Sequence, residues 1–131
     1  MTEKLRLSAI IPAKPDEIYE SWLDSKKHSE MTGSEAEVNP KIEGKFTAWD
    51  GYIEGITTEM EPNRRIVQKW RTTDFPPGSP DSTVEIILEK VDKGTKIVLI
   101  HTEIPEGQKD DYKQGWKDFY FNPMKDYFES K

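Results

Sequence analysis

The sequence contains no cysteine, which excludes disulfide bonds, a thiolate nucleophile and thiolate metal ligands. Histidine is almost as scarce, because His28 and His101 are the only two and lie far apart in the chain. No third histidine and no cysteine can complete a metal site of the usual type. We therefore expect neither a metal site nor a cofactor.

Long hydrophobic runs are also missing. The chain has no stretch of about 18 apolar residues, and its start, MTEKLRL, lacks the apolar region of a signal peptide. The net charge is −6, so the surface lacks the excess of positive charge with which proteins bind phosphate groups. These features predict a cytoplasmic protein with neither a membrane nor a nucleic acid as its partner.

Motifs for catalysis do not stand out either. The sequence has no nucleophile elbow, no glycine-rich phosphate loop and no capped catalytic dyad. We therefore name no catalytic residues, and a protein without enzymatic activity is the expectation. The 131 residues suffice for one hydrophobic core and leave no room for a second, so residues 1–131 are expected to form a single domain.

The most informative stretch is Tyr112–Phe128, which holds seven of the chain's fourteen aromatic residues. Wound as a helix, it presents an apolar arc roughly 140° wide. The arc comprises Tyr112, Trp116, Phe119, Tyr120, Pro123, Met124 and Tyr127. Two interpretations stay open: a core helix packed on a sheet, or a helix that also closes a ligand cavity. Pro123 is expected to kink the helix, because proline removes one backbone N–H and its ring collides with the preceding turn.

The upstream part of the chain predicts strands. A first strand over residues 5–11 precedes a helix that opens at Pro15 and a shorter helix over residues 25–31 capped by Ser25. About six antiparallel strands follow, and Asp50-Gly51 is predicted to be the two-residue type I′ turn of a hairpin. The order predicts an α+β protein. A curved antiparallel sheet of six or seven strands would wrap around a long C-terminal helix, with one or two short helices after the first strand.

Seven segments occur in the order typical of one family. They are Gly44-Lys45-Phe46, Asp50-Gly51 with Gly55, Pro62, Ile66-Val67-Gln68-Lys69-Trp70-Arg71, Phe75-Pro76 with Gly78, Ile104-Pro105, and Gln114-Gly115-Trp116 with Tyr120-Phe121. Together they resemble the family named after the C-terminal domain of the activator of the heat-shock protein 90 ATPase. That family belongs to the SRPBCC superfamily of START and birch-pollen-allergen-like proteins. The resemblance implies a helix-grip fold over nearly the whole chain.

The resemblance implies a function less directly, since proteins of one fold carry many functions. The activator has a further N-terminal domain that makes major contacts with the chaperone, whereas this chain begins with its predicted first strand. We therefore expect at most weak stimulation of a chaperone. Phe75 stands where the family usually has tryptophan, which alters this loop slightly and keeps it apolar.

A candidate ligand site follows from the fold and the aromatic residues. Strand alternation that turns Leu99 toward the helix also turns His101 to the concave face of the sheet. The predicted apolar cavity between helix and sheet is lined by Phe46, Trp70, Ile86, Leu99, Trp116, Tyr120 and Met124, with His101 as its polar anchor. The alternative is that the same side chains fill the space completely.

Three functions remain open on this basis. The first is a non-catalytic carrier or sensor of a small hydrophobic ligand. The second is a protein-interaction module acting on a heat-shock protein 90-type chaperone, and the third is a cyclase- or hydrolase-like enzyme of the same superfamily. A dry, continuous cavity favours the carrier, and polar groups converging inside the cavity favour the enzyme. A filled core beneath an exposed apolar or charged patch favours the interaction module.

Overall fold

The computed structural model describes residues 2–130. Its strands form one antiparallel sheet in the order β1-β7-β6-β5-β4-β3-β2. They are β1 (Thr2–Ile11), β2 (Glu37–Val38), β3 (Lys45–Ala48), β4 (Ile53–Glu61), β5 (Arg65–Thr72), β6 (Ser82–Val91) and β7 (Gly94–Pro105). After β1 the chain crosses to the opposite edge of the sheet and returns as a meander until β7 pairs with β1. This confirms the predicted sheet of six or seven strands.

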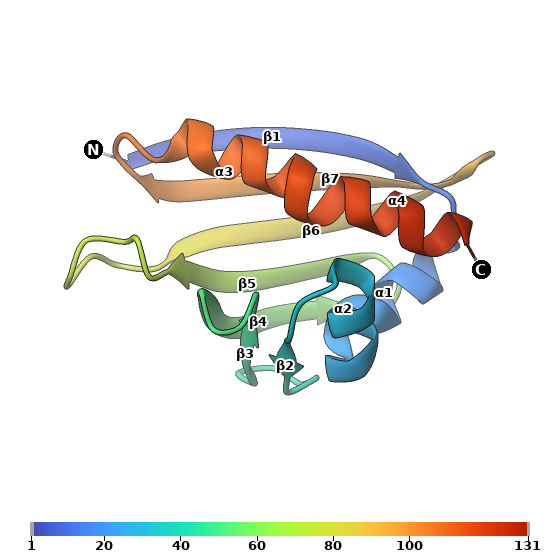
Figure 1. Ribbon diagram of the computed structural model, residues 1–131, viewed down its shortest axis with the longest axis horizontal. Coiled ribbons are helices and arrows are strands. Elements are labelled where there is room, and N and C mark those ends of the chain that lie inside the picture. The colour runs from blue at the N-terminus through green and yellow to red at the C-terminus, as the bar shows by residue number, and fades with distance from the viewer. Residues whose placement is uncertain (1, 131) are drawn as a thin grey trace.

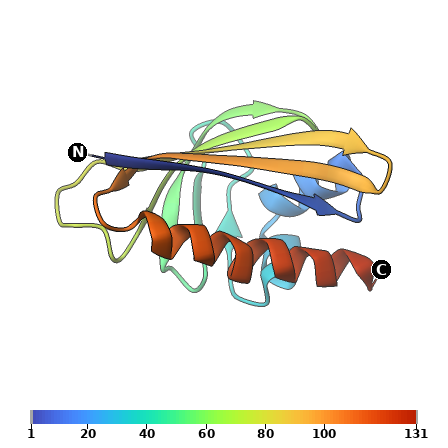
Figure 2. The same ribbon diagram turned by 90° about the horizontal axis from the view of Figure 1, so that it is seen from above.

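The helices lie on one side of this sheet. They are α1 (Pro15–Leu23), α2 (Ser25–Thr32), α3 (Lys109–Trp116), the π-helical turn η1 (Lys117–Phe121) and α4 (Asn122–Glu129). Figures 1 and 2 show α3, η1 and α4 running as one continuous helix across the sheet, with α1 and α2 near its C-terminal end. The α+β helix-grip architecture is therefore confirmed.

The cap of α2 differs from the prediction. The carboxylate of Asp24, not the hydroxyl of Ser25, accepts the free backbone N–H of the first turn, that of Lys27, at 2.8 Å. Asp24 has the extended backbone of a capping residue, and a carboxylate there also complements the helix dipole. The Ser25 hydroxyl accepts from the N–H of Val38 at 2.8 Å and so ties α2 to β2.

The β3–β4 connection is longer than the predicted two-residue type I′ turn. The strands end at Ala48 and resume at Ile53. Trp49, Asp50 and Gly51 all take left-handed φ values of 52°, 56° and 90°. The prediction was wrong because it placed Trp49 in the strand, where Asp-Gly alone would need positive φ. Trp49 instead leaves the sheet with the loop.

The buried side chains of the C-terminal helix recur every four residues. They include Tyr112, Trp116, Tyr120, Met124 and Phe128. In a regular α-helix each such step overshoots a full turn by about 40°, so the row would wind away from the sheet. The π-helical turn corrects part of this drift, because its bonds span five residues, as in the bond from the Asn122 N–H to the Lys117 carbonyl.

Two expectations for this helix need correction. Phe119 belongs to the predicted apolar arc but is 53% exposed, because the wider turn rotates it away from the sheet. The irregularity also lies at η1 rather than at Pro123. Pro123 follows the π-helical turn directly, so its missing backbone N–H falls where the regular α-helical bonding is already interrupted.

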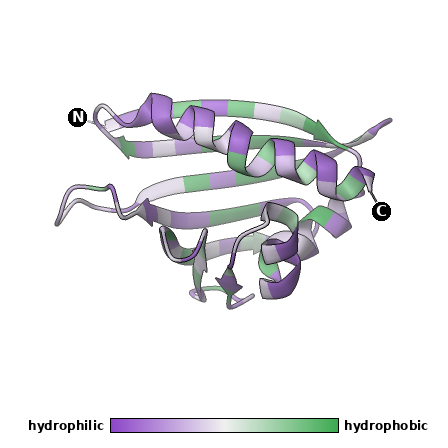
Figure 3. Cartoon of the chain, viewed as in Figure 1, coloured by the Kyte–Doolittle hydropathy of each residue, from purple (hydrophilic) through white to green (hydrophobic). Residues whose placement is uncertain are grey.

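The core lies between the helix and the concave face of the sheet. Val84, Ile86 and Leu88 alternate with more exposed residues along β6, and Glu85 points outward to pair with Arg65, as the alternation predicts. Figure 3 shows hydrophobic and hydrophilic residues interleaved along the strands and the helix. Each element therefore buries one apolar face.

Candidate functional site

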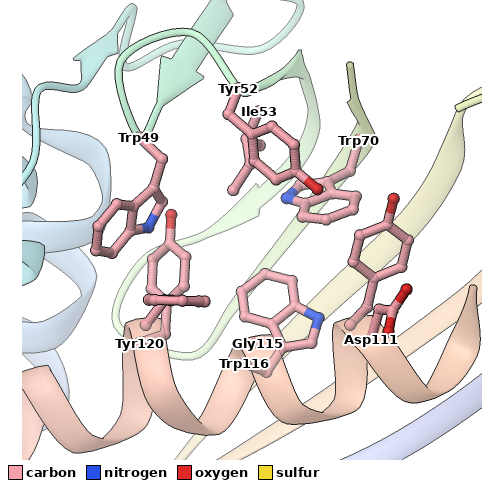
Figure 4. Close-up of a pocket in the computed structure, with 10 residues that line it drawn as sticks. Trp49, Tyr52, Ile53, Trp70, Asp111, Gly115, Trp116 and Tyr120 are labelled. Atoms are coloured by element: carbon pink, nitrogen blue, oxygen red, sulfur yellow. The ribbon is translucent and has the colours of Figure 1, made fainter. Parts of the chain in front are cut away.

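A cavity of about 370 Å³ lies between the Trp49–Tyr52 loop and the first half of the C-terminal helix (Figure 4). Its lining residues are Trp49, Tyr52, Ile53, Trp70, Asp111, Tyr112, Gly115, Trp116, Phe119 and Tyr120. The volume falls in the range of small-molecule sites, roughly 300–1,000 Å³. The core is therefore not completely filled at this end of the sheet.

The loop that forms one wall is held by backbone contacts. Asp50 donates its N–H to the Glu35 carbonyl at 3.0 Å, and its carboxylate accepts the Glu35 N–H at 3.2 Å. These bonds fix the loop to the segment before β2. They also place Trp49 against Phe119, with ring centroids 5.2 Å apart in an edge-to-face arrangement.

The Trp49 indole has an unusual hydrogen-bonding state. Its Nε1–H is buried and has no partner within the part of the chain that the structure describes. A buried donor without a partner costs about 1–3 kcal/mol. Trp49 lines the cavity with its ring, whereas its N–H is shielded from solvent.

The opposite wall consists of aromatic rings packed edge-to-face or tilted against one another. Trp70 on β5 contacts Tyr112 and Trp116 on α3, with centroid distances of 5.2 Å and 5.5 Å. Trp116 in turn contacts Tyr120 at 4.9 Å. All four side chains are at least nine-tenths buried, so the wall is rigid and mainly apolar.

His101 lies behind this wall, and its two ring nitrogens are both engaged. The Trp116 Nε1–H donates to Nδ1 at 3.1 Å, which leaves Nε2 as the protonated nitrogen, and Nε2 lies 2.8 Å from the Ser82 hydroxyl. The Ser82 hydroxyl in turn donates a hydrogen bond to the Trp70 carbonyl at 2.6 Å. Burial lowers the pKa of His101 to about 3, so the ring is neutral.

His28 is the second buried histidine and supports Tyr120 from the other side. Its Nδ1 donates to the Trp22 carbonyl at 2.9 Å, and its Nε2 accepts from the Tyr120 hydroxyl at 3.0 Å. Burial lowers the pKa of His28, against the opposing effect of the bond to Trp22. Burial also raises the pKa of Tyr120. The Tyr120 ring is therefore fixed at the cavity wall by a neutral partner.

The structure brings together three of the eight predicted site residues. Trp70, Trp116 and Tyr120 line the cavity. The remaining five are buried in the core away from the lining: Phe46, Ile86, Leu99, His101 and Met124. His101 in particular has no free ring nitrogen with which to anchor a ligand.

The sequence did not predict the lining residues of the Trp49–Tyr52 loop, nor the one charged lining residue, Asp111. Trp49 was assigned to a strand, and Tyr52, Asp111 and Phe119 were not chosen as site residues. The sequence signal for Trp49 was its position beside Asp50-Gly51, where a large aromatic side chain next to a turn leaves the sheet. No comparable local signal exists for Asp111.

Among residues 2–130 no group of three histidine, aspartate or glutamate side chains is arranged to hold a metal ion. Burial raises the pKa of Tyr112 to about 12, and its hydroxyl already donates to Gln108 at 2.7 Å.

The described helices include none that is long and apolar enough to span a membrane.

The fold and this cavity define the class: a helix-grip protein with an aromatic cavity under its C-terminal helix. Residues 12–129 match the model of the "Activator of Hsp90 ATPase homolog 1-like protein" family. The chain therefore belongs to this family of homologues of the activator of the heat-shock protein 90 ATPase, as the order of its motifs predicted.

Individual relatives agree with this assignment. The chain is 29% identical over 129 residues to the human activator of 90 kDa heat shock protein ATPase homolog 1, covering 97% of this chain and 37% of that protein. It is 27% identical over 116 residues to the Hsp90 co-chaperone AHA1 of Saccharomyces cerevisiae, covering 83% of this chain and 33% of that protein. The chain thus spans about a third of these curated relatives.

Solved structures include relatives of similar length. An HSP90 activator from Plasmodium falciparum superposes with a TM-score of 0.79 at 27% identity, covering 93% of this chain and 91% of that one. A protein from Mesorhizobium loti superposes with a TM-score of 0.82 at 18% identity, covering 98% of both chains. The second match supports the fold alone.

Proposed function

We propose that this chain is a co-chaperone module that stimulates ATP turnover by a heat-shock protein 90-type chaperone. The strongest support is the match to the P. falciparum HSP90 activator, because it extends over 91% of a chain about as long as this one. The curated activators support the same function over the third of their length that this chain spans. The sequence alone favoured ligand binding over action on a chaperone. The comparisons support the co-chaperone function more strongly, so we place it first.

A basic groove offers a docking surface for this function. It runs between β1 and α3 and is lined by Lys4, Leu5, Arg6, Ile100, Lys109 and Lys113. Lys4, Arg6 and Lys113 are exposed, and none of the four cations in the groove forms an ion pair within the described part of the chain. On a protein with a net charge of −6, such a local cluster favours an acidic partner surface.

The test measures ATP turnover by the chaperone from the same source with increasing amounts of this protein. We expect saturable stimulation that weakens as salt is added, because contacts between exposed charges are screened. The double variant Lys4→Glu/Lys113→Glu should weaken apparent binding by roughly tenfold or more. The control variant Lys90→Glu/Lys93→Glu changes the net charge equally at exposed positions near the β6–β7 turn and should behave as the unmodified protein.

Two results would count against this proposal. No stimulation and no binding to the chaperone at any concentration would overturn the co-chaperone function. Equal losses in both double variants would leave the function standing but remove the basic groove as its docking surface. Since all four lysines concerned are exposed, neither double variant should unfold the domain.

A second function, binding of a small organic ligand, is supported by the aromatic cavity. Its size and its apolar walls are typical of a site that accepts a mostly apolar molecule. Intrinsic tryptophan fluorescence would be titrated with fatty acids, aromatic polyketide-like compounds and isoprenoids. A saturable change is expected, since Trp49, Trp70 and Trp116 all line the cavity. No change with any compound would remove this function.

A further inference from the structure

The walls of the cavity have an unusual composition. Seven of the ten lining residues are aromatic, and the one charged residue among them is the carboxylate of Asp111. Figure 4 shows Trp49, Tyr52, Trp70 and Trp116 on different sides of the open space, with Asp111 at its edge. Rings on several sides of one space form an aromatic cage. The carboxylate at its edge would not contribute to the binding of a purely apolar ligand.

The electrostatics of this cage favour a cation. The face of each aromatic ring carries partial negative charge, which attracts a positive group placed above it. Neither lysine nor arginine lines the cavity. The nearby lysines of the helix point elsewhere, since Lys109 and Lys113 line the groove against β1 and Lys117 lines a neighbouring groove. No basic side chain therefore opposes a cation here.

We propose that this cavity binds an alkylated ammonium group, with its methyl groups against the rings of Trp49, Trp70 and Trp116 and its charge balanced by Asp111. An unmethylated ammonium fits less well, because it would lose more hydration on entering an apolar cage. The inference rests on the ligand-binding function proposed above and names the chemical class of the ligand.

A matched pair of probes tests the charge. The cation (3-hydroxyphenyl)trimethylammonium and its neutral isostere 3-tert-butylphenol have the same shape, and both carry a hydroxyl oxygen. Isothermal titration calorimetry should show the cation binding about tenfold more tightly, a preference to which the aromatic rings and Asp111 both contribute. Asp111→Asn removes only the contribution of the carboxylate and should therefore reduce this preference without abolishing it. Asp110→Asn, an exposed neighbour outside the lining, is the control and should keep it.

The outcomes separate this inference from the broader function. Equal binding of both probes would overturn the cation proposal and leave ligand binding in place, whereas binding of neither probe at millimolar concentration would overturn the cation proposal outright. A response to the panel of apolar compounds would then still support a neutral ligand. The source of the group is distinguished by a trimethyllysine peptide and its unmodified lysine control. Selective binding of the methylated peptide assigns the group to a protein side chain, and binding of the free ion alone assigns it to a small molecule.

Discussion

The indole N–H of Trp116 donates to Nδ1 of His101 across 3.1 Å, from the C-terminal helix to β7. This bond fixes the tautomer of the histidine, so Nε2 carries the proton and points to Ser82 at 2.8 Å. The helix and the sheet are therefore connected by a buried polar contact inside a mainly apolar core. It holds Trp116 in one orientation at the wall of the cavity.

The neutral state of His101 predicts a dependence of stability on pH. Its folded pKa of about 3 lies below the unfolded value of 6.5, so between these values the unfolded state binds more protons. Stability is therefore full above about pH 6.5 and falls as the pH decreases toward 3. His28 acts in the same direction, since its pKa is also lowered. From about pH 7 to 5, His101 alone should cost about 2 kcal/mol of unfolding free energy.

Urea unfolding at both pH values would measure this loss, and His101→Asn should reduce the dependence while lowering stability at neutral pH. Histidine titration by NMR gives a direct control. If the His101 ring titrates near its usual pKa of about 6.5 in the folded protein, the buried neutral state described above is wrong.

Truncation of Trp116 tests the packing of the C-terminal helix against the sheet. Trp116→Ala removes a ring that is only 3% exposed and should cost about 3–5 kcal/mol. Trp116→Phe keeps an aromatic ring but leaves His101 Nδ1 without its donor, and should cost about 1–3 kcal/mol. Both are measured by chemical denaturation. A loss below about 1 kcal/mol for the alanine variant would contradict the assignment of this helix face.

The sequence was sufficient for the fold, because alternation along β6 and the aromatic stretch of the last helix are local signals. Val84 and Ile86 follow the period of a strand, and Trp116 and Tyr120 follow the spacing of a helix face. The exposure of Phe119 could not be predicted from such local signals. It depends on a π-helical turn that keeps the four-residue row on the sheet, and therefore on packing between distant segments.

The sequence predicted the cavity between the helix and the sheet, but most of its lining residues were not predicted. The lining, like the exposure of Phe119, depends on contacts between segments that are distant in the sequence. Trp49 reaches the cavity because three consecutive left-handed residues carry the loop over the helix, and tertiary bonds from Asp50 to Glu35 hold them there. Turn statistics around Asp-Gly favour a shorter hairpin and contain no information about Glu35. His101 was correctly placed on the concave face, but its partners come from β6 and α3.

A pair of glycine variants should have opposite effects. A Cβ at Gly55 would lie 1.8 Å from the Lys69 carbonyl oxygen and 2.8 Å from the Phe46 ring, so Gly55→Ala should cost about 3 kcal/mol. A Cβ at Gly115 meets only the Phe119 ring at 3.7 Å, so Gly115→Ala should stabilise the helix by up to about 1 kcal/mol. Thermal melts would compare them. Equal effects at both positions would contradict the close approach of the Lys69 carbonyl on β5 to Gly55 on β4.

The last prediction concerns the closure of the cavity by the loop. Trp49 and Phe119 come from different elements, yet their ring centroids lie 5.2 Å apart. An edge-to-face pair of this kind contributes about 0.5–1.5 kcal/mol beyond its buried area. A double-mutant cycle with Trp49→Ala, Phe119→Ala and the combined variant should give a coupling energy in this range, because each single change already removes the contact. The control cycle pairs Trp49→Ala with Ile42→Ala, another exposed hydrophobic side chain, and should be additive. Additivity of Trp49 and Phe119 to within about 0.3 kcal/mol would mean that the loop does not rest on the helix in solution, and the cavity would then lack one wall.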